Sequence, residues 1–336
     1  MRGAKNNKNQ AHWFSDMLMY GSAAGILVVL SVWAILAEVS FSALSKAKLK
    51  LQQKRCVLYC AQDQVFAEPI FAEFKRQTGL RVSAVFDSEA VKTVGLANRL
   101  IAEKSHPQCD VFWSNEELRT RQLAAHNIFR ETNGWVAMGY RSRRIVINTT
   151  RLPVTNAPMS LMELTNSVWR GKVALAYPLF GTTATHFLAL RQHWGVERWE
   201  SWCRALAANK PFLVDGNSVV VKLVARGEAW IGLTDSDDIA SARHEGASIE
   251  ALPLNAEMLL IPNTVAVIKG AQHPAAAQRL FEHLQQPEII EKLVAANALE
   301  GISQSDVTVS TLKPDWHLML CDLEAGTDQL KRIFLQ

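Results

Sequence analysis

The feature that most constrains this chain is a stretch without a formal charge, Met17–Ala37, which is flanked by an acidic residue on each side. A helix of about 20 apolar residues crosses a hydrocarbon core of about 30 Å, so the stretch predicts a membrane span or a long signal sequence. Arg2, Lys5 and Lys8 precede it as a positive n-region, but no small-x-small cleavage site or lipid-accepting cysteine follows. We therefore expect an uncleaved anchor.

Charge alone leaves the orientation of this anchor open. Five basic residues follow the run, namely Lys46, Lys48, Lys50, Lys54 and Arg55. This bias places the rest of the chain in the cytoplasm, although long domains translocate largely regardless of charge. The amino-terminal region therefore divides into a tail (1–16), the anchor or signal (17–37) and a basic linker (38–55).

The remaining chain has the size and composition of one large or two ordinary globular domains. About 280 residues follow the linker, and the whole chain is 49% hydrophobic. The net charge is only +4, and no basic stripe with interleaved aromatic residues appears, so we expect no nucleic-acid partner. The five cysteines form no metal-binding spacing, and buried, inert thiols are the favoured interpretation.

Apolar runs and helical patterns alternate along this body. The expected strands are 56–61, 80–86, 110–113, 144–148, 173–176, 211–214 and 230–234, and the expected helices include 68–77, 90–104, 116–126, 275–284 and 287–296. Alternation of this kind predicts α/β architecture with open, mostly parallel sheets covered by helices on both faces. Ligands gather at the carboxyl ends of the strands in such sheets.

Small polar and charged residues follow several of these strands. They are Gln62-Asp63, Ser114-Asn115, Phe180-Gly181-Thr182-Thr183, Asn217-Ser218 and Thr234-Asp235-Ser236-Asp237-Asp238. Because the strand ends converge, these segments are the candidate binding site. For the last segment, capping of the following helix is a structural alternative. An EF-hand is excluded, since Ala240 and Gly246 stand at its turn and last positions, counted from Asp235.

The order of several segments resembles periplasmic solute-binding proteins of the ferric-iron type. The segments are Val57–Asp63, Phe74–Val82, Cys109–Trp113, Tyr140–Asn148, Trp169–Val173, Asn217-Ser218 and Ala225–Glu228. The resemblance spans roughly Cys56 to Ala296. It implies two α/β lobes joined by a hinge, with a cleft between them. The first lobe comprises residues 56–146 and the returning segment 265–336 with its C-terminal helices, and the second lobe comprises residues 147–264. It also implies a body in the periplasm that delivers a small-molecule or ion ligand to the permease and ATPase of an ABC importer.

The ligand residues depart from this family. The resemblance places Ser236 and Asp237 where ferric binders have an adjacent tyrosine pair, Asp63 at the histidine position and Asn115 at the glutamate position. Phenolate ligands are therefore expected to be missing from the cleft. The carboxylates at Asp63, Asp235 and Asp237 suit either a hard cation or the ammonium or hydroxyl groups of an organic solute.

An anionic group is expected at the other side of the site. Gly181-Thr182-Thr183 begins a helix and offers N–H groups and hydroxyls, and the family resemblance places an anion there. Arg141 and Arg143 either bind that anion or form salt bridges in the hinge. The expected binding residues are Asp63, Asn115, Arg141, Gly181, Thr182, Thr183, Asn217, Ser218, Asp235, Ser236 and Asp237. No cofactor is required, although a bound metal cation or phosphate-like anion is compatible with them.

No catalytic motif appears in the sequence. The chain has no G-x-S-x-G, H-E-x-x-H, Walker-type or dinucleotide-binding signature, so we expect a binding protein and not an enzyme. The alternative function is a membrane-anchored sensor that uses the same body to report its ligand to a partner protein.

Overall fold

The structure is a computed structural model that describes Trp33 and residues 55–86, 92–132 and 134–335. The predicted tail, anchor and linker lie outside these residues, apart from Trp33 and Arg55. In the part of the chain that is described, no helix combines the length and the apolar character that a membrane crossing requires. Contacts divide the chain into residues 1–54 and the unit Arg55–Gln336, which contains every element considered below.

The first strands of the body form a parallel group. Strand β1 (Arg55–Cys60) lies between β2 (Arg81–Phe86) and β3 (Val111–Ser114). The intervening and following helices are α2 (Gln64–Thr78), α3 (Lys92–Ala102) and α4 (Glu117–Ala125). Gly79 ends α2 in a left-handed conformation (φ 71°), as the Thr78-Gly79 pair predicts.

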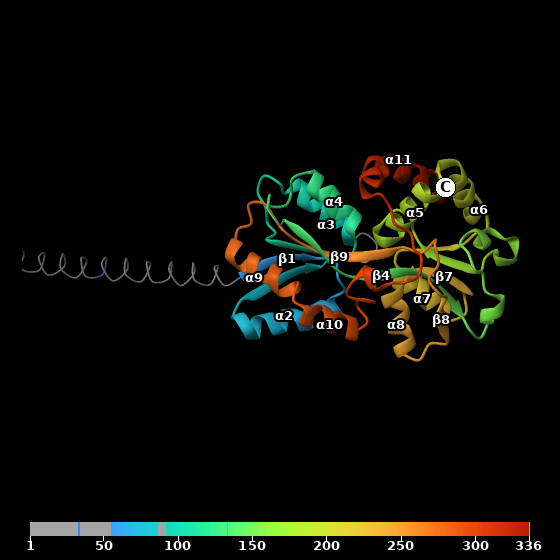
Figure 1. Cartoon of the computed structure of the whole chain (residues 1–336), viewed down its shortest axis with the longest axis horizontal. Helices are drawn as coiled ribbons and strands as arrows, with labels where there is room; N and C mark the ends of the chain where they lie inside the picture. The colour runs from blue at the N-terminus through green and yellow to red at the C-terminus, as the bar shows by residue number, and fades with distance from the viewer. Residues whose placement is uncertain (1–32, 34–54, 87–91, 133, 336) are drawn as a thin grey trace, which may run out of the picture. The chain divides into compact units, whose positions relative to one another are not determined.

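Helices cover both faces of this group (Figure 1). Leu58 and Cys60 of β1 pack into a cluster with α2 and the later helices α9 (Pro274–Leu284) and α10 (Pro287–Ala295). Tyr59, between them in sequence, points to the opposite face and packs with α3 and α4. Side chains that alternate between two buried faces explain why the strand reads as a continuous apolar run.

A second group of strands repeats this layered arrangement. Strand β5 (Val173–Ala176) is parallel to β6 (Phe212–Val214) and β7 (Ile231–Asp235). One face packs against α5 (Gly181–Trp194), α6 (Val196–Ala208) and α11 (Trp316–Phe334), and the other against α7 (Asn217–Ala225) and α8 (Ser236–His244) (Figure 1).

One long strand joins the two groups. Strand β4 (Trp135–Asn148) pairs with β9 (Leu260–Val267) up to Ser142 and, from Arg143 onward, with β7 and the short β8 (Ile249–Ala251). All these pairings are antiparallel, as is that of β9 with β3. The expectation of mostly parallel sheets is therefore wrong for the middle of the body: the strands form one mixed, hydrogen-bonded path through β4.

A bulge shapes the first half of β4. The pairing register with β9 shifts between Met138 and Tyr140, and Gly139 between them has a positive φ of 56°. A Cβ atom on Gly139 would lie 2.5 Å from a methyl group of Leu299, so glycine is required there both by conformation and by space.

The C-terminal helix does not lie with the first group of strands alone. Helix α11 packs on α5 and α6 and also contacts α4. Its Met319 and Leu323 belong to the same apolar cluster as Leu118 of α4. The segment 265–336 therefore contributes α9 and α10 to the first group and α11 mainly to the second.

Candidate functional site

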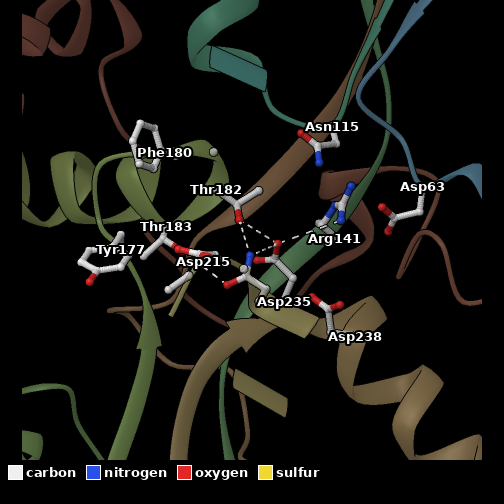
Figure 2. Close-up of a pocket in the computed structure, with 14 residues that line it drawn as sticks. Asp63, Asn115, Arg141, Tyr177, Phe180, Thr182, Thr183, Asp215, Asp235 and Asp238 are labelled. Carbon is white, nitrogen blue, oxygen red and sulfur yellow. Dashed lines mark hydrogen bonds and ion pairs between the residues drawn. The ribbon is translucent and has the colours of Figure 1, made fainter. Parts of the chain in front are cut away.

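A pocket lies where the strands β4, β5 and β7 and the starts of several helices meet (Figure 2). Its void measures about 570 Å³, including space open to solvent. The lining residues are Asp63, Asn115, Arg141, Ala176, Tyr177, Phe180, Gly181, Thr182, Thr183, Asp215, Gly216, Asn217, Asp235 and Asp238. Helices α5, α7 and α8 all begin beside it, as expected for a site at the carboxyl ends of strands.

Arg143 holds the wall of the pocket together from behind. Its side chain is fully buried, and Nη1 donates to Asp235 Oδ1 at 2.7 Å and to Asn217 Oδ1 at 3.0 Å. Nη2 donates to the carbonyl oxygen of Leu233 at 3.2 Å. Asp235 Oδ2 accepts from Thr182 Oγ1 at 2.7 Å and from Asn217 Nδ2 at 3.0 Å. One buried ion pair thus connects β4, the end of β7 and the first turns of α5 and α7.

Arg141 forms a second buried pair closer to the pocket. Nη1 donates to Asp237 Oδ2 and lies 4.0 Å from Asp235 Oδ2. Nη2 donates to Gln62 Oε1 at 3.3 Å, and that oxygen also accepts from Asn263 Nδ2 at 2.9 Å. Of the two interpretations given to the arginines, the salt-bridged one describes both.

The carboxylates outnumber the guanidinium groups at this site. Ligand atoms of Asp235, Asp237 and Asp238 lie within 4.8 Å of one another. Burial, together with the charges of Asp235 and Asp63, raises the pKa of Asp237 to about 7, although Arg141 opposes the shift. Burial and the neighbouring carboxylates also raise the pKa of Asp238 well above its ordinary value. The site therefore favours ligand groups that are positive or that donate hydrogen bonds.

The first turns of α5 and α7 bring residues with free backbone N–H groups to the lining of the pocket. The first turn of a helix has no carbonyl partners within the helix for its N–H groups. Helix α5 begins at Gly181, with φ 52°, and α7 begins at Asn217, and both residues line the pocket. In Figure 2, Thr183 and Tyr177 lie on one side of Asp235, whereas Asp63 and Asp238 lie on the other. The pocket thus has an N–H-rich end and an acidic end, and the exposed Asp215 lies at the edge of the former.

The structure brings together eight of the predicted binding residues. Asp63, Asn115, Arg141, Gly181, Thr182, Thr183, Asn217 and Asp235 all line the pocket. Ser218, Ser236 and Asp237 are not among its lining residues. Ser236 Oγ accepts a hydrogen bond from the backbone of Ser142, and Asp237 points to Arg141. Asp235 occupies the N-cap position of α8, but its carboxylate makes no capping bond and instead binds Arg143.

Six lining residues were not among the expected binding residues: Ala176, Tyr177, Phe180, Asp215, Gly216 and Asp238. Phe180 and Asp238 belong to the polar segments that follow predicted strands, and Tyr177, Asp215 and Gly216 lie within two residues of the ends of the predicted strands 173–176 and 211–214. Tyr177 places one phenol group in the lining of the pocket. It follows β5, however, and not β7, where the tyrosine pair was sought.

Two further buried groups lie near the pocket but outside its lining. Glu116 caps α4 by accepting from the backbone N–H of Arg119, and Thr185 of α5 donates to it at 3.2 Å. Burial raises the pKa of Glu116 to about 7. His186 contacts the carbonyl oxygen of Glu257 at 2.7 Å, and burial lowers its pKa to about 3. His186 is thus a buried core histidine, and it does not line the pocket.

Comparisons with known proteins agree with this architecture. The family model described as bacterial extracellular solute-binding protein matches residues 57–296. The major ferric iron-binding protein of Neisseria meningitidis is 25% identical over 76% of this chain and 83% of its own length.

Solved structures show the same fold. Iron-bound HitA from Pseudomonas aeruginosa has a TM-score of 0.72 at 19% identity, over 83% of this chain and 99% of its own. AfuA from Actinobacillus pleuropneumoniae, with fructose-6-phosphate bound, has a TM-score of 0.72 at 17% identity, over 84% of this chain and 98% of its own. The chain therefore belongs to the bacterial extracellular solute-binding proteins and is the extracytoplasmic solute-binding component of an ABC transport system, not an enzyme.

Proposed function

We propose that the pocket binds a small organic solute that carries an anionic group at one end and an amino or hydroxyl-bearing group at the other. The observation that carries this proposal is the split of the pocket into an N–H-rich end and an acidic end. An anion at the start of α5 would accept from the backbone N–H groups of Gly181, Thr182 and Thr183, where the helix dipole also favours negative charge.

The arginines do not supply the anion site by themselves. Arg143 is fully buried behind the wall, and Arg141 is engaged by Asp237 and Gln62. At the opposite end, the carboxylates of Asp63 and Asp238 would accept hydrogen bonds from ammonium or hydroxyl groups of the solute. A positive group there would also relieve the repulsion among the neighbouring carboxylates.

The residues do not fit ferric iron in the phenolate mode. The relatives named above bind ferric iron or fructose-6-phosphate, according to their descriptions. The family resemblance assigns Ser236 and Asp237 to the tyrosine-pair position. Ser236 accepts from the backbone of β4, and Asp237 accepts from Arg141. A phosphorylated or zwitterionic solute is therefore favoured over a metal ion, because it matches both ends of the pocket.

Solute capture would involve a hinge between two lobes. One lobe would consist of residues 56–146 and 265–336, and the other of residues 147–264. The change of partners along β4, between Ser142 and Arg143, supports a hinge at that point.

Residues 17–37 would tether the body to the membrane, near the permease and ATPase that receive the solute. Such a tether raises the effective concentration of the binding protein at the permease without any new contact. Protease treatment of intact spheroplasts should remove the body, and its protection would contradict this orientation.

The test is a thermal-shift screen of the purified protein against phosphonates, sugar phosphates, amino acids, polyamines, divalent metals, and ferric salts with and without phosphate. A ligand at 100 times its Kd stabilises by about 2.7 kcal/mol, which corresponds to a rise in Tm of roughly 5–10 °C. Thr183→Pro at the anion end and Asp63→Asn at the acidic end should each weaken the shift.

A matched control is Asp328→Asn, which lies on the exposed face of α11 and should leave the shift unchanged. Stabilisation by a neutral apolar compound that neither pocket variant affects would contradict the proposal. So would stabilisation by ferric salts alone.

A further inference from the structure

The three neighbouring carboxylates of Asp235, Asp237 and Asp238 have the composition of a hard-cation site. Oxygen ligands of this kind suit divalent metals, and their ligand atoms lie within 4.8 Å of one another. A guanidinium group is already present among them. Arg141 Nη1 donates to Asp237 Oδ2 and lies 4.0 Å from Asp235 Oδ2, and Asp63 and Asp238 are also close enough to act on its charge.

We propose that Arg141 is a built-in cation that keeps metal ions out of the pocket, and that this residue sets the specificity of the protein for an organic solute. The inference deepens the proposed function and rests on it for the location of the site. It concerns a residue of this chain, and its test does not require the solute to be known.

The position of the guanidinium is fixed from three sides. Arg141 is only 3% exposed. It extends from β4, Asp237 of α8 accepts from one nitrogen, and Gln62, which follows β1, accepts from another. Asn263 of β9 in turn fixes Gln62. To move aside for a metal ion, the side chain would have to break these contacts.

The carboxylate cluster retains an unused acceptor beside the arginine. Asp237 is 4% exposed, and its Oδ1 atom is buried and has no hydrogen-bond partner among the described residues. A buried carboxylate oxygen without a partner is costly. If the guanidinium charge were removed, the cluster would have three carboxylates against Arg143 alone, and a metal ion would supply the missing charge.

A simpler interpretation is that Arg141 only stabilises the fold through a buried ion pair. The two interpretations differ in one measurable respect. A structural pair predicts that its loss lowers stability and nothing more, whereas a built-in cation predicts that its loss creates a metal site.

The experiment measures Mn²⁺ binding to the full-length protein by electron paramagnetic resonance and calorimetry. The variants are Arg141→Gln, which can still donate to Asp237 but has no charge, and Arg141→Lys, which keeps the charge. A unit charge about 4 Å from a divalent ion changes its affinity roughly thirtyfold in the dielectric of water, and by more at a lower effective dielectric. We therefore expect Arg141→Gln to bind one Mn²⁺ at least about thirtyfold more tightly than the wild type, and Arg141→Lys to resemble the wild type.

Two controls locate the effect. Arg144→Gln removes an arginine of the same strand that pairs with Glu300, outside the cluster, and should gain no site. The double variant Arg141→Gln with Asp237→Asn should lose the gained Mn²⁺ binding. The proposal is overturned if the wild type binds Mn²⁺ as tightly as Arg141→Gln, or if the gained binding survives Asp237→Asn.

Folding does not limit the test. Should Arg141→Gln fail to fold alone, circular dichroism with and without Mn²⁺ decides the matter, because a metal site predicts that Mn²⁺ restores the fold. Failure of Mn²⁺ to do so contradicts the proposal. A failed solute screen with the wild type would contradict the proposed function while leaving these Mn²⁺ results to stand by themselves.

Discussion

The buried pair of Arg143 and Asp235 gives the most direct test of how this pocket is built. Arg143→Met keeps an unbranched apolar stem of similar length to that of arginine but removes the guanidinium charge and its donors. Asp235 would then remain 2% exposed, with Thr182 and Asn217 as its neutral donors and Arg141 at 4.0 Å. The variant therefore leaves a buried carboxylate with reduced compensation.

Breaking a buried pair on one side costs roughly 3–5 kcal/mol. Three further acceptors lose one donor each, since Arg143 also binds Asn217, Thr182 and the carbonyl oxygen of Leu233, so the upper part of that range applies. For a body of this size each kcal/mol corresponds to about 2–4 °C in Tm. We expect Arg143→Met to lower Tm by roughly 8–20 °C.

Differential scanning calorimetry of the wild type and two variants provides the assay. The matched control is Arg204→Met, because Arg204 forms an exposed pair with Glu200 on α6. Exposed helical pairs contribute only about 0.3–0.5 kcal/mol, so this control should shift Tm by less than about 2 °C. A change in Tm no larger for Arg143→Met than for Arg204→Met would refute the view that this pair organises the wall.

Two further predictions concern buried groups away from the wall. The pKa of Glu116 is raised from 4.5 to about 7, so the folded protein holds the proton on this carboxyl more tightly than the unfolded chain does. The stability that the protonated Glu116 contributes is therefore lost as pH rises from 4.5 to 7. Glu116→Gln should therefore gain in Tm relative to the wild type between pH 5 and 8, by up to the equivalent of about 3 kcal/mol, and a pH-independent difference would contradict this. Gly139→Ala should lower the free energy of unfolding by about 1–3 kcal/mol in urea titrations, because alanine is strained at a φ of 56° and its Cβ meets Leu299. Gly79 also has a positive φ, of 71°, but no atom lies near the position of an added Cβ, so Gly79→Ala should lower the free energy of unfolding by less.

The regular parts of the fold were predictable because their signals are local. Strand β1 and helix α2 follow from an apolar run, a helical period and the Thr78-Gly79 stop signal. The first half of β4 was missed, and the strand begins at Trp135 where the sequence suggested Arg144. A glycine and two buried arginines within nine residues do not resemble a strand, since their stabilising partners come from distant segments such as Gln62 and Asp237.

The candidate site was predicted in outline for a similar reason. Polar residues after a strand converge in sheets of this type, and Asp63, Asn217 and Asp235 accordingly line one pocket. The direction of each side chain in the first turn of α8 is not set by spacing. Asp238 lines the pocket while Asp237 turns to Arg141, because the guanidinium of β4 selects one of the two adjacent carboxylates.

The two arginines of β4 connect the architecture to the binding site. Arg141 and Arg143 are two residues apart, so both side chains leave the strand on the same face. Arg141 reaches Gln62 beside the first group of strands, and Arg143 reaches Asn217 in the second. The strand changes partners between these two positions. A rotation of one group against the other would therefore act first on Arg141, whose contacts include both Gln62 and Asp237, while the contacts of Arg143 would move as one unit. Arg141 is accordingly the residue through which the proposed hinge movement would alter the acidic end of the pocket.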